Sequence, residues 1–149
     1  MPDTYSNLLY HVVFSTKHRA PIITEKIRER LYEYIGGIVR NEGGTLLEIG
    51  GMEDHIHLLA RLKPTLAVAE AARLIKANSS KWLNENVVSD RFRWQAGYGA
   101  FTVGESMVAD VSRYIRNQAH HHRKRTFQEE FVELLELNEI DYDKDRIWD

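Results

Sequence analysis

The sequence predicts one α+β domain, because short strand-like segments alternate with longer segments of helical periodicity along its 149 residues. Two observations support this prediction. β-Branched and aromatic residues gather in short runs that are bounded by glycine or proline. Between these runs, apolar residues recur every three or four positions. A hydrophobic content of 43% and a charged content of 28% are typical of a soluble globular protein.

The first half of the chain predicts a strand, a helix and a hairpin. The segment YHVVFSTK at 10–17 is rich in β-branched and aromatic residues, which favours a strand. Thr24 can cap a helix whose apolar residues keep helical spacing to about Arg40, before a Gly-Gly pair ends it. The apolar runs 45–52 and 55–62 follow each other closely and predict two strands of a hairpin.

The second half predicts three further helices and one short strand. A helix runs from about Pro64 to about Asn84, and a loop rich in arginine and aromatic residues follows it. A short strand is predicted at 99–104, and Ser106 can cap the next helix. Apolar residues at helical spacing over 131–137 indicate the last helix.

The first six elements follow the order β-α-β-β-α-β, which is that of a ferredoxin-like fold. We therefore expect a ferredoxin-like antiparallel sheet with helices packed on one face, in a single domain over 1–149. A C-terminal helix is expected over 105–125, and the end of the chain, 139–149, is expected to be an irregular acidic tail.

Charge is distributed unevenly along the chain. Residues 129–149 hold nine acidic and two basic side chains, a net charge of −7. Because the whole chain carries −2, residues 1–128 carry +5. A basic body suits a polyanionic partner, and the alternative is a solvated C-terminal helix with charged faces.

Cysteine usage and hydropathy limit the compartment. The chain has no cysteine, which excludes disulfides and thiolate metal sites. The first ten residues lack a basic start followed by an apolar stretch, so we expect no signal peptide. No apolar run approaches the roughly 20 residues of a membrane span. A cytoplasmic protein without membrane contact is therefore expected.

Two histidines stand two positions apart in the strand 55–62. Side chains alternate between the faces of a strand, so His55 and His57 share one face, whereas Ile56 and Leu58 point to the other face and the core. Neutral imidazole is a common metal ligand, and the pair could bind one divalent ion. The alternative is two histidines on a polar sheet face.

A second group of side chains that could take part in catalysis or metal binding lies in the segment VSRYIRNQAHHHRKR at 111–125. Tyr114 and Gln118 are four positions apart and share one face of a helix. The phenol and the amide oxygen could serve covalent catalysis beside a metal. The alternative is that Tyr114 is a half-buried tyrosine packed on the sheet and Gln118 an ordinary surface amide. Consecutive helix residues point about 100° apart, so the three histidines at 120–122 are interpreted as a DNA-facing stretch or as plain surface.

Taken together, these patterns resemble the single-tyrosine transposases of the HUH endonuclease superfamily, which move small insertion sequences as single-stranded DNA. The residues that carry the resemblance are HIH at 55–57, YHVVFSTKHRAPI at 10–22, FRWQAGYGAFTVGES at 92–106, VSRYIRNQAHHH at 111–122 and TFQEEF at 126–131.

The resemblance implies a metal centre and a nucleophile. His55, His57 and Gln118 match the ligands of Mg²⁺ or Mn²⁺, and Tyr114 matches the nucleophile, which becomes joined to DNA as a 5′-phosphotyrosine. The implied activity is cleavage and rejoining of single-stranded DNA at hairpin-marked element ends. No nucleotide cofactor is expected, since the chain has no phosphate-binding G-x-x-x-x-G-K-[ST] loop.

The resemblance also implies a homodimer in which a mobile tyrosine helix, 105–125, completes the active site of the partner subunit. The strand at 10–16 is the candidate for the sheet edge that the two copies would share. Gly97, Gly99 and Gly104 could let the helix swing away from its own sheet.

Basic and aromatic residues suggest where DNA would bind. Arginine planes and aromatic rings stack on unpaired bases, so Phe92, Trp94 and Tyr98 are candidates for stacking, and packing of their loop onto the sheet is the alternative. The candidates for phosphate contacts are Lys17, Arg19, Arg73, Lys76, Lys81, Arg91, Arg93, Arg113 and Arg116.

Two other functions are compatible with parts of the pattern. A domesticated relative could bind a DNA hairpin and perform no transposition, although such a protein does not need the histidine pair, Tyr114 and Gln118 together. A ferredoxin-like domain unrelated to nucleic acid could carry the H-x-H by chance. Retention on single-stranded DNA at low and high salt discriminates between these two.

Overall fold

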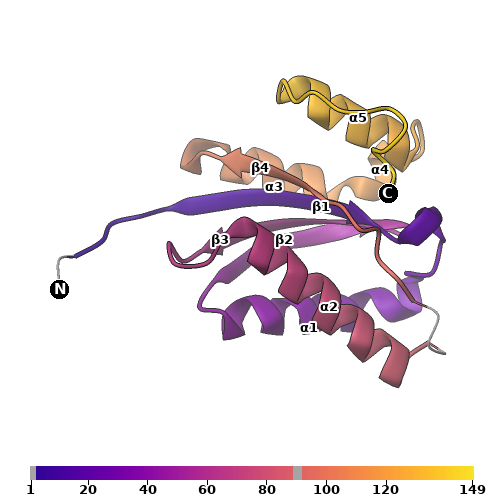
Figure 1. Ribbon diagram of the computed structural model, residues 1–149, viewed down its shortest axis with the longest axis horizontal. Helices are drawn as coiled ribbons and strands as arrows, with labels where there is room; N and C mark the ends of the chain where they lie inside the picture. Colours follow the sequence, from indigo (N-terminus) through magenta and orange to yellow (C-terminus); the bar gives the residue numbers. More distant parts are fainter. Residues whose placement is uncertain (1–2, 89–91) are drawn as a thin grey trace.

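The computed structural model describes residues 3–88 and 92–149, and its centre is one four-stranded sheet (Figure 1). The strands are β1 (Leu8–Ser15), β2 (Thr45–Met52), β3 (His55–Leu62) and β4 (Gly99–Val103). Their order across the sheet is β2-β3-β1-β4, and every neighbouring pair is antiparallel. The predicted α+β fold with a ferredoxin-like antiparallel sheet is confirmed.

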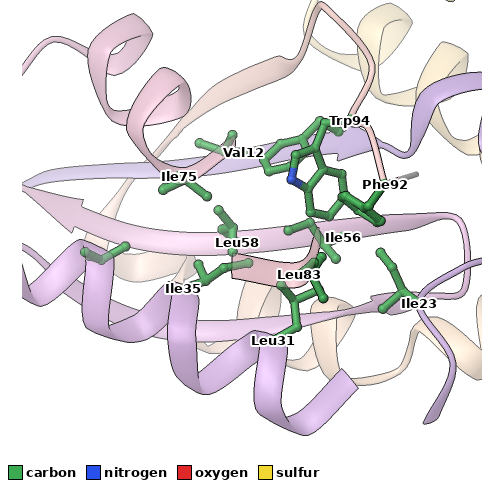
Figure 2. Close-up of a cluster of buried hydrophobic side chains, with 12 residues drawn as sticks. Val12, Ile23, Leu31, Ile35, Ile56, Leu58, Ile75, Leu83, Phe92 and Trp94 are labelled. Carbon is green, nitrogen blue, oxygen red and sulfur yellow. The ribbon is translucent and has the colours of Figure 1, made fainter. Parts of the chain in front are cut away.

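One face of the sheet is covered by α1 (Glu25–Asn41) and α2 (Val68–Asn86), as predicted (Figure 1). Apolar residues at helical spacing explain this packing, because they form one stripe along each helix. The stripes meet apolar side chains of β1 and β3 in the main core (Figure 2). Its buried members are Val12, Phe14, Ile23, Leu31, Ile35, Val39, Ile56, Leu58, Ile75, Leu83, Phe92 and Trp94.

The first strand lies inside the sheet, which corrects one expectation. β1 pairs with β3 on one side and with β4 on the other, so its backbone groups are already bonded within the chain. The strand at 10–16 therefore cannot be an edge that joins two copies, and the edges of this sheet are β2 and β4. The pairing of β4 with β1, two strands that are far apart in the sequence, occupies the edge that β1 would otherwise present.

The opposite face carries α3 (Val108–Arg116), α4 (Gln118–His121) and α5 (Phe127–Leu137) (Figure 1). Short 3₁₀ turns at Lys17–Arg19 and Glu105–Met107 complete the described elements. The stretch 105–125, expected as one helix, is divided at Asn117, whose backbone departs from helical angles (φ −95°, ψ 25°). Among the described residues, no helix has both the length and the apolar character to cross a membrane.

A second apolar cluster attaches α5 to the sheet. The cluster joins Phe127, Phe131 and Leu135 of α5 to Val13 of the inner strand β1 and Phe101 of the edge strand β4. The acidic tail returns over this cluster, where its apolar members Tyr142, Ile147 and Trp148 are half-buried. A capping box begins α5 at its N-terminus. The Thr126 side chain accepts a hydrogen bond from the Glu129 backbone, and the Glu129 side chain accepts one from the Thr126 backbone.

The close approach of α3 to β2 requires a glycine at position 50. A Cβ atom there would lie 2.4 Å from the Ile115 backbone oxygen, closer than atoms can approach. Gly50→Ala should therefore push α3 outward and lower the free energy of unfolding by about 1–3 kcal/mol. Urea denaturation measures this change. Gly104→Ala is the control, because a Cβ at Gly104 meets no atom of the described residues within 4 Å. A similar loss of stability in both variants would contradict a clash between position 50 and α3.

Candidate metal and tyrosine site

The two histidines of β3 face α3, α4 and α5, and both are fully buried. Ile56 and Leu58 lie in the main core on the other side of the sheet, so the predicted division of faces is confirmed (Figure 2). The backbone alternation of β3 produces this division, and Gly50, which is paired with His57, leaves room for α3.

Three further side chains from the C-terminal part of the chain converge on these imidazoles. The Gln118 Oε1 atom lies 2.9 Å from His55 Nε2 and 3.1 Å from His122 Nε2. The Glu130 Oε1 atom lies 3.0 Å from His57 Nε2, 2.9 Å from His122 Nε2 and 3.4 Å from His55 Nε2. Gln118 is buried, so the alternative of a surface amide is wrong.

Each of the three imidazoles is oriented by a partner on its outer nitrogen. His55 Nδ1 bonds Asp54 at 2.8 Å, and His122 Nδ1 donates to the Arg125 carbonyl oxygen at 2.9 Å. His57 Nδ1 lies 2.8 Å from His11 Nε2. All three Nε2 atoms therefore point at one centre, which is how metal-binding histidines are held by their outer partners.

The charge of Glu130 governs the electrostatics of the cluster. Burial would raise the pKa of this carboxyl group, but hydrogen bonds with His122, His55 and His57 hold its pKa far below the usual range. Burial would lower the pKa of His55, whereas hydrogen bonds to Asp54, Glu130 and Gln118 raise it to about 9. Burial lowers the pKa of His57 to about 4.

Tyr114 reaches the same centre from α3. Its half-buried hydroxyl donates to the Glu130 carboxylate and accepts a 2.8 Å hydrogen bond from the Arg125 guanidinium. Its ring lies edge-on to His57, with 5.8 Å between the ring centroids. Burial, and then the negative charge of Glu130, raise the pKa of the phenol above its usual value, which keeps the proton on the oxygen.

The part of the chain that carries the β3 histidines, Tyr114 and Gln118 matches a known family. Residues 4–118 match the family model described as "Transposase IS200 like", from before β1 to Gln118. The chain belongs to the IS200-like transposase family. The family resemblance drawn from the sequence is therefore confirmed.

Individual relatives agree with this membership. The ISDra2 transposase TnpA of Deinococcus radiodurans is 25% identical over 118 residues, covering 74% of this chain and 84% of the relative. A crystal structure of a protein from Deinococcus radiodurans R1, assigned as a transposase, is 22% identical and has a TM-score of 0.64, covering 79% of this chain and 95% of the other. A REP-associated tyrosine transposase bound to a REP hairpin is 13% identical and has a TM-score of 0.60, covering 82% and 73%.

The donor set of this IS200-like transposase fits a divalent metal ion. Within the described residues, His55, His122 and Glu130 each offer one ligand atom, and these atoms lie within 4.8 Å of one another. Imidazole nitrogens with amide and carboxylate oxygens are common ligands of first-row divalent ions. The ligand roles predicted for His55, His57 and Gln118 stay predictions, and their side chains share this centre.

Two members of the cluster, His122 and Glu130, were missed by the sequence analysis. His122 follows Tyr114 and Gln118 at steps of four, a signal that the sequence contains. The run of three consecutive histidines at 120–122 masks this spacing. Glu130 has no such signal, since it enters the cluster through the packing of α5 on the far end of the sheet.

Some of the basic residues predicted to contact DNA lie near this site. Lys17, Arg19 and Arg93 line one hollow with Trp148, next to the end of β1. Others are engaged elsewhere: Arg113 pairs with Asp110 at 3.2 Å. The remaining member of this helix, Arg116, pairs with Glu48 at 3.2 Å.

The predicted contacts on α2 lie across the sheet from the tyrosine. Arg73 pairs with Glu70, and Lys81 is exposed on the same helix. Lys76 donates to the backbone oxygens of Ala96 and Gly97 at 2.9 and 3.0 Å, which gives it a structural role in the loop before β4. Arg91 lies outside the described residues.

The aromatic residues of the loop before β4 mostly serve the core. Phe92 and Trp94 are buried, and both rings stand edge-on to neighbours in the main core (Figure 2). They cannot stack on bases in this arrangement, so that prediction is wrong for these two residues. Tyr98 is half-buried against the main core.

Proposed function

We propose that this chain is a metal-dependent transposase that cleaves and rejoins single-stranded DNA through Tyr114. The observation that carries the proposal is the meeting of three distant segments at one buried centre. The phenol of Tyr114 and the amide of Gln118 lie beside the imidazoles of β3, linked through Glu130. A cluster of this kind is the expected arrangement for a nucleophile beside a metal.

The residues proposed to hold the metal, Mg²⁺ or Mn²⁺, are His55, His57 and Gln118. When bound, the ion supplies Lewis-acid polarisation of a phosphodiester and orients it. Asp54 and His11 bond the outer nitrogens of these two imidazoles, which holds their inner nitrogens toward the centre where an ion would bind.

Tyr114 is proposed as the nucleophile. Its oxygen would attack phosphorus and form an O–P bond, while the bond from phosphorus to the 3′ oxygen breaks. The phenol proton passes to water, and the departing 3′ oxygen takes up a proton from water to become a hydroxyl group. The same steps in reverse rejoin DNA without a nucleotide cofactor, because the phosphotyrosine retains the energy of the original bond.

A hollow beside the cluster, lined by four basic and three acidic side chains, supports an approach by nucleic acid. Arg19, Arg123 and Lys124 line it together with His122 and Asp54. Phosphate contacts by such side chains position a strand without reading its sequence. We infer that single-stranded DNA next to a hairpin is the substrate, by analogy with the neighbour that is bound to a REP hairpin.

The proposed activity is tested with labelled hairpin oligonucleotides taken from the DNA that flanks the gene. The protein is incubated with Mg²⁺, with Mn²⁺ or with a chelator, and the products are separated on a denaturing gel. A protein–DNA band that requires metal supports the proposal. Tight hairpin binding without this band, also in a random hairpin pool, would support the domesticated hairpin-binding protein instead.

A homodimer with active sites completed in trans is the arrangement that the family resemblance implies. In the described chain, however, Tyr114 lies beside His57 of its own chain. A site in trans would therefore need α3 to be exchanged between two copies.

Mixing two inactive variants tests the arrangement in trans. Tyr114→Phe keeps the histidines, and His57→Ala keeps the tyrosine. If sites form in trans, a mixed dimer regains one complete site, and the adduct reappears on mixing. If each chain uses its own tyrosine, the mixture stays inactive. Sedimentation of the unmixed wild-type protein gives its oligomeric state separately.

A further inference from the structure

We infer that Glu130 and His122 are additional ligands of the metal centre, so that the C-terminal helix α5 supplies part of the active site. The inference rests on the proposed function, because it assumes that the histidines of β3 bind a metal. Both residues lie beyond Gln118, where the match to the family model ends. They are therefore features of this chain's C-terminal segment.

The positions of the donor atoms support this assignment. Glu130 Oε1 lies within 3.4 Å of the Nε2 atoms of all three clustered imidazoles, those of His55, His57 and His122. Atoms that share one divalent ion at bond lengths of about 2.0–2.2 Å are separated by about 3 Å, which is close to the separations here. A metal ion can thus replace the protons that link these nitrogens to the carboxylate.

The orientation of His122 is that of a metal ligand. The Arg125 carbonyl oxygen can only accept a hydrogen bond, so Nδ1 of His122 carries a proton. In the neutral ring, the lone pair is then on Nε2, which points at the centre. His120, two positions earlier, is exposed instead.

Charge gives Glu130 a role that the other donors cannot fill. Imidazole and amide groups are neutral when they bind a metal, whereas a divalent ion in a buried site needs negative charge nearby. Glu130 is fully buried, and its carboxylate supplies that charge. Mg²⁺ also prefers oxygen ligands, so a site with histidine and one amide oxygen would favour it less.

The second oxygen of Glu130 connects the metal centre to the nucleophile. Its Oε2 accepts from the Tyr114 hydroxyl and, at 3.0 Å, from Gln118 Nε2. Phe127 and Phe131, on either side of Glu130 in α5, are anchored in the second apolar cluster and fix its position. The same carboxylate therefore positions Tyr114 beside the ion.

Metal titration of the full-length protein tests the inference. Mn²⁺ is added to wild-type protein, and bound ion is measured by calorimetry and by loss of the free-ion electron spin resonance signal. Glu130→Gln keeps the shape of the side chain and should weaken Mn²⁺ binding by at least roughly tenfold. His122→Ala should weaken it in the same direction.

The matched control is Glu133→Gln on the same helix. Glu133 is exposed and accepts from Arg125, whose guanidinium also bonds Tyr114. A glutamine oxygen at position 133 can still accept from Arg125, so Glu133→Gln should bind Mn²⁺ as the wild type does. Infrared difference spectra add a second measurement, which a purely structural role of Glu130 would leave unchanged. A shift of a carboxylate stretch on metal addition should be present in Glu133→Gln and absent in Glu130→Gln.

His57→Ala separates this inference from the proposed function. If the wild type binds Mn²⁺ and His57→Ala does not, the metal centre is supported. If Glu130→Gln then binds Mn²⁺ with wild-type affinity and still shows the carboxylate shift, the inference is overturned while the proposed function stands. If the wild type binds no Mn²⁺, the proposed metal dependence fails, and the inference fails with it. Thermal melting of each variant verifies that it is folded.

Discussion

Tyr114→Phe is expected to abolish the covalent protein–DNA adduct while leaving the protein folded. Phenylalanine keeps the ring against His57 and His121 and removes the oxygen that would bond to phosphorus. Deletion of a nucleophile costs about 10⁶-fold in a serine protease, and a similar loss would put the adduct below detection. Denaturing gels of metal-containing reactions measure it.

The stability cost of this variant should be small compared with the loss of activity. The Glu130 carboxylate loses the hydrogen bond from Tyr114 and keeps those from Gln118 and His57, so we expect about 1–3 kcal/mol. Tyr142→Phe is the control, because this tyrosine lies in the acidic tail near Glu136. An adduct of normal yield in Tyr114→Phe would refute the assigned nucleophile.

Phe131→Ala is expected to cause the largest loss of stability among the variants of the C-terminal segment. Phe131 is 5% exposed and lies between Phe127, Trp148 and the backbone of Gly99. Removal of such a ring leaves a cavity and typically costs about 3–5 kcal/mol. Urea denaturation measures the change in the free energy of unfolding.

Leu137→Ala is the matched control for Phe131→Ala. Leu137 belongs to the same helix but is 72% exposed, so its truncation should change stability by no more than about 0.5 kcal/mol. Because α5 carries Glu130 into the site, Phe131→Ala should also weaken Mn²⁺ binding at temperatures where the protein is still folded. Equal denaturation midpoints for the two variants would show that α5 is not anchored as described.

Local patterns predicted the elements and one face of the site. Alternation in β3 correctly separated His55 and His57 from Ile56 and Leu58, because the period of a strand leaves no other choice. Helical spacing likewise predicted α1 and α2 and their packing on one face of the sheet. These features depend on neighbouring residues alone, which is why they are readable from sequence.

Long-range packing accounts for what the sequence did not reveal. The central position of β1 depends on which strands pair, and this cannot be read from the composition of β1 itself. The entry of Glu130 into the site depends on α5 folding back over β1 and β4. The burial of Phe92 and Trp94 was not predictable for the same reason, because it depends on packing against distant residues such as Phe14.

The most direct test of the central claim is to identify the residue that carries the DNA. The protein is incubated with Mn²⁺ and an oligonucleotide from the flanking DNA, digested with protease and nuclease, and examined by mass spectrometry. The account predicts a nucleotide joined through its 5′ phosphate to the peptide that contains Tyr114. A nucleotide on any other residue, or DNA cleaved with no nucleotide attached to the protein, would contradict it.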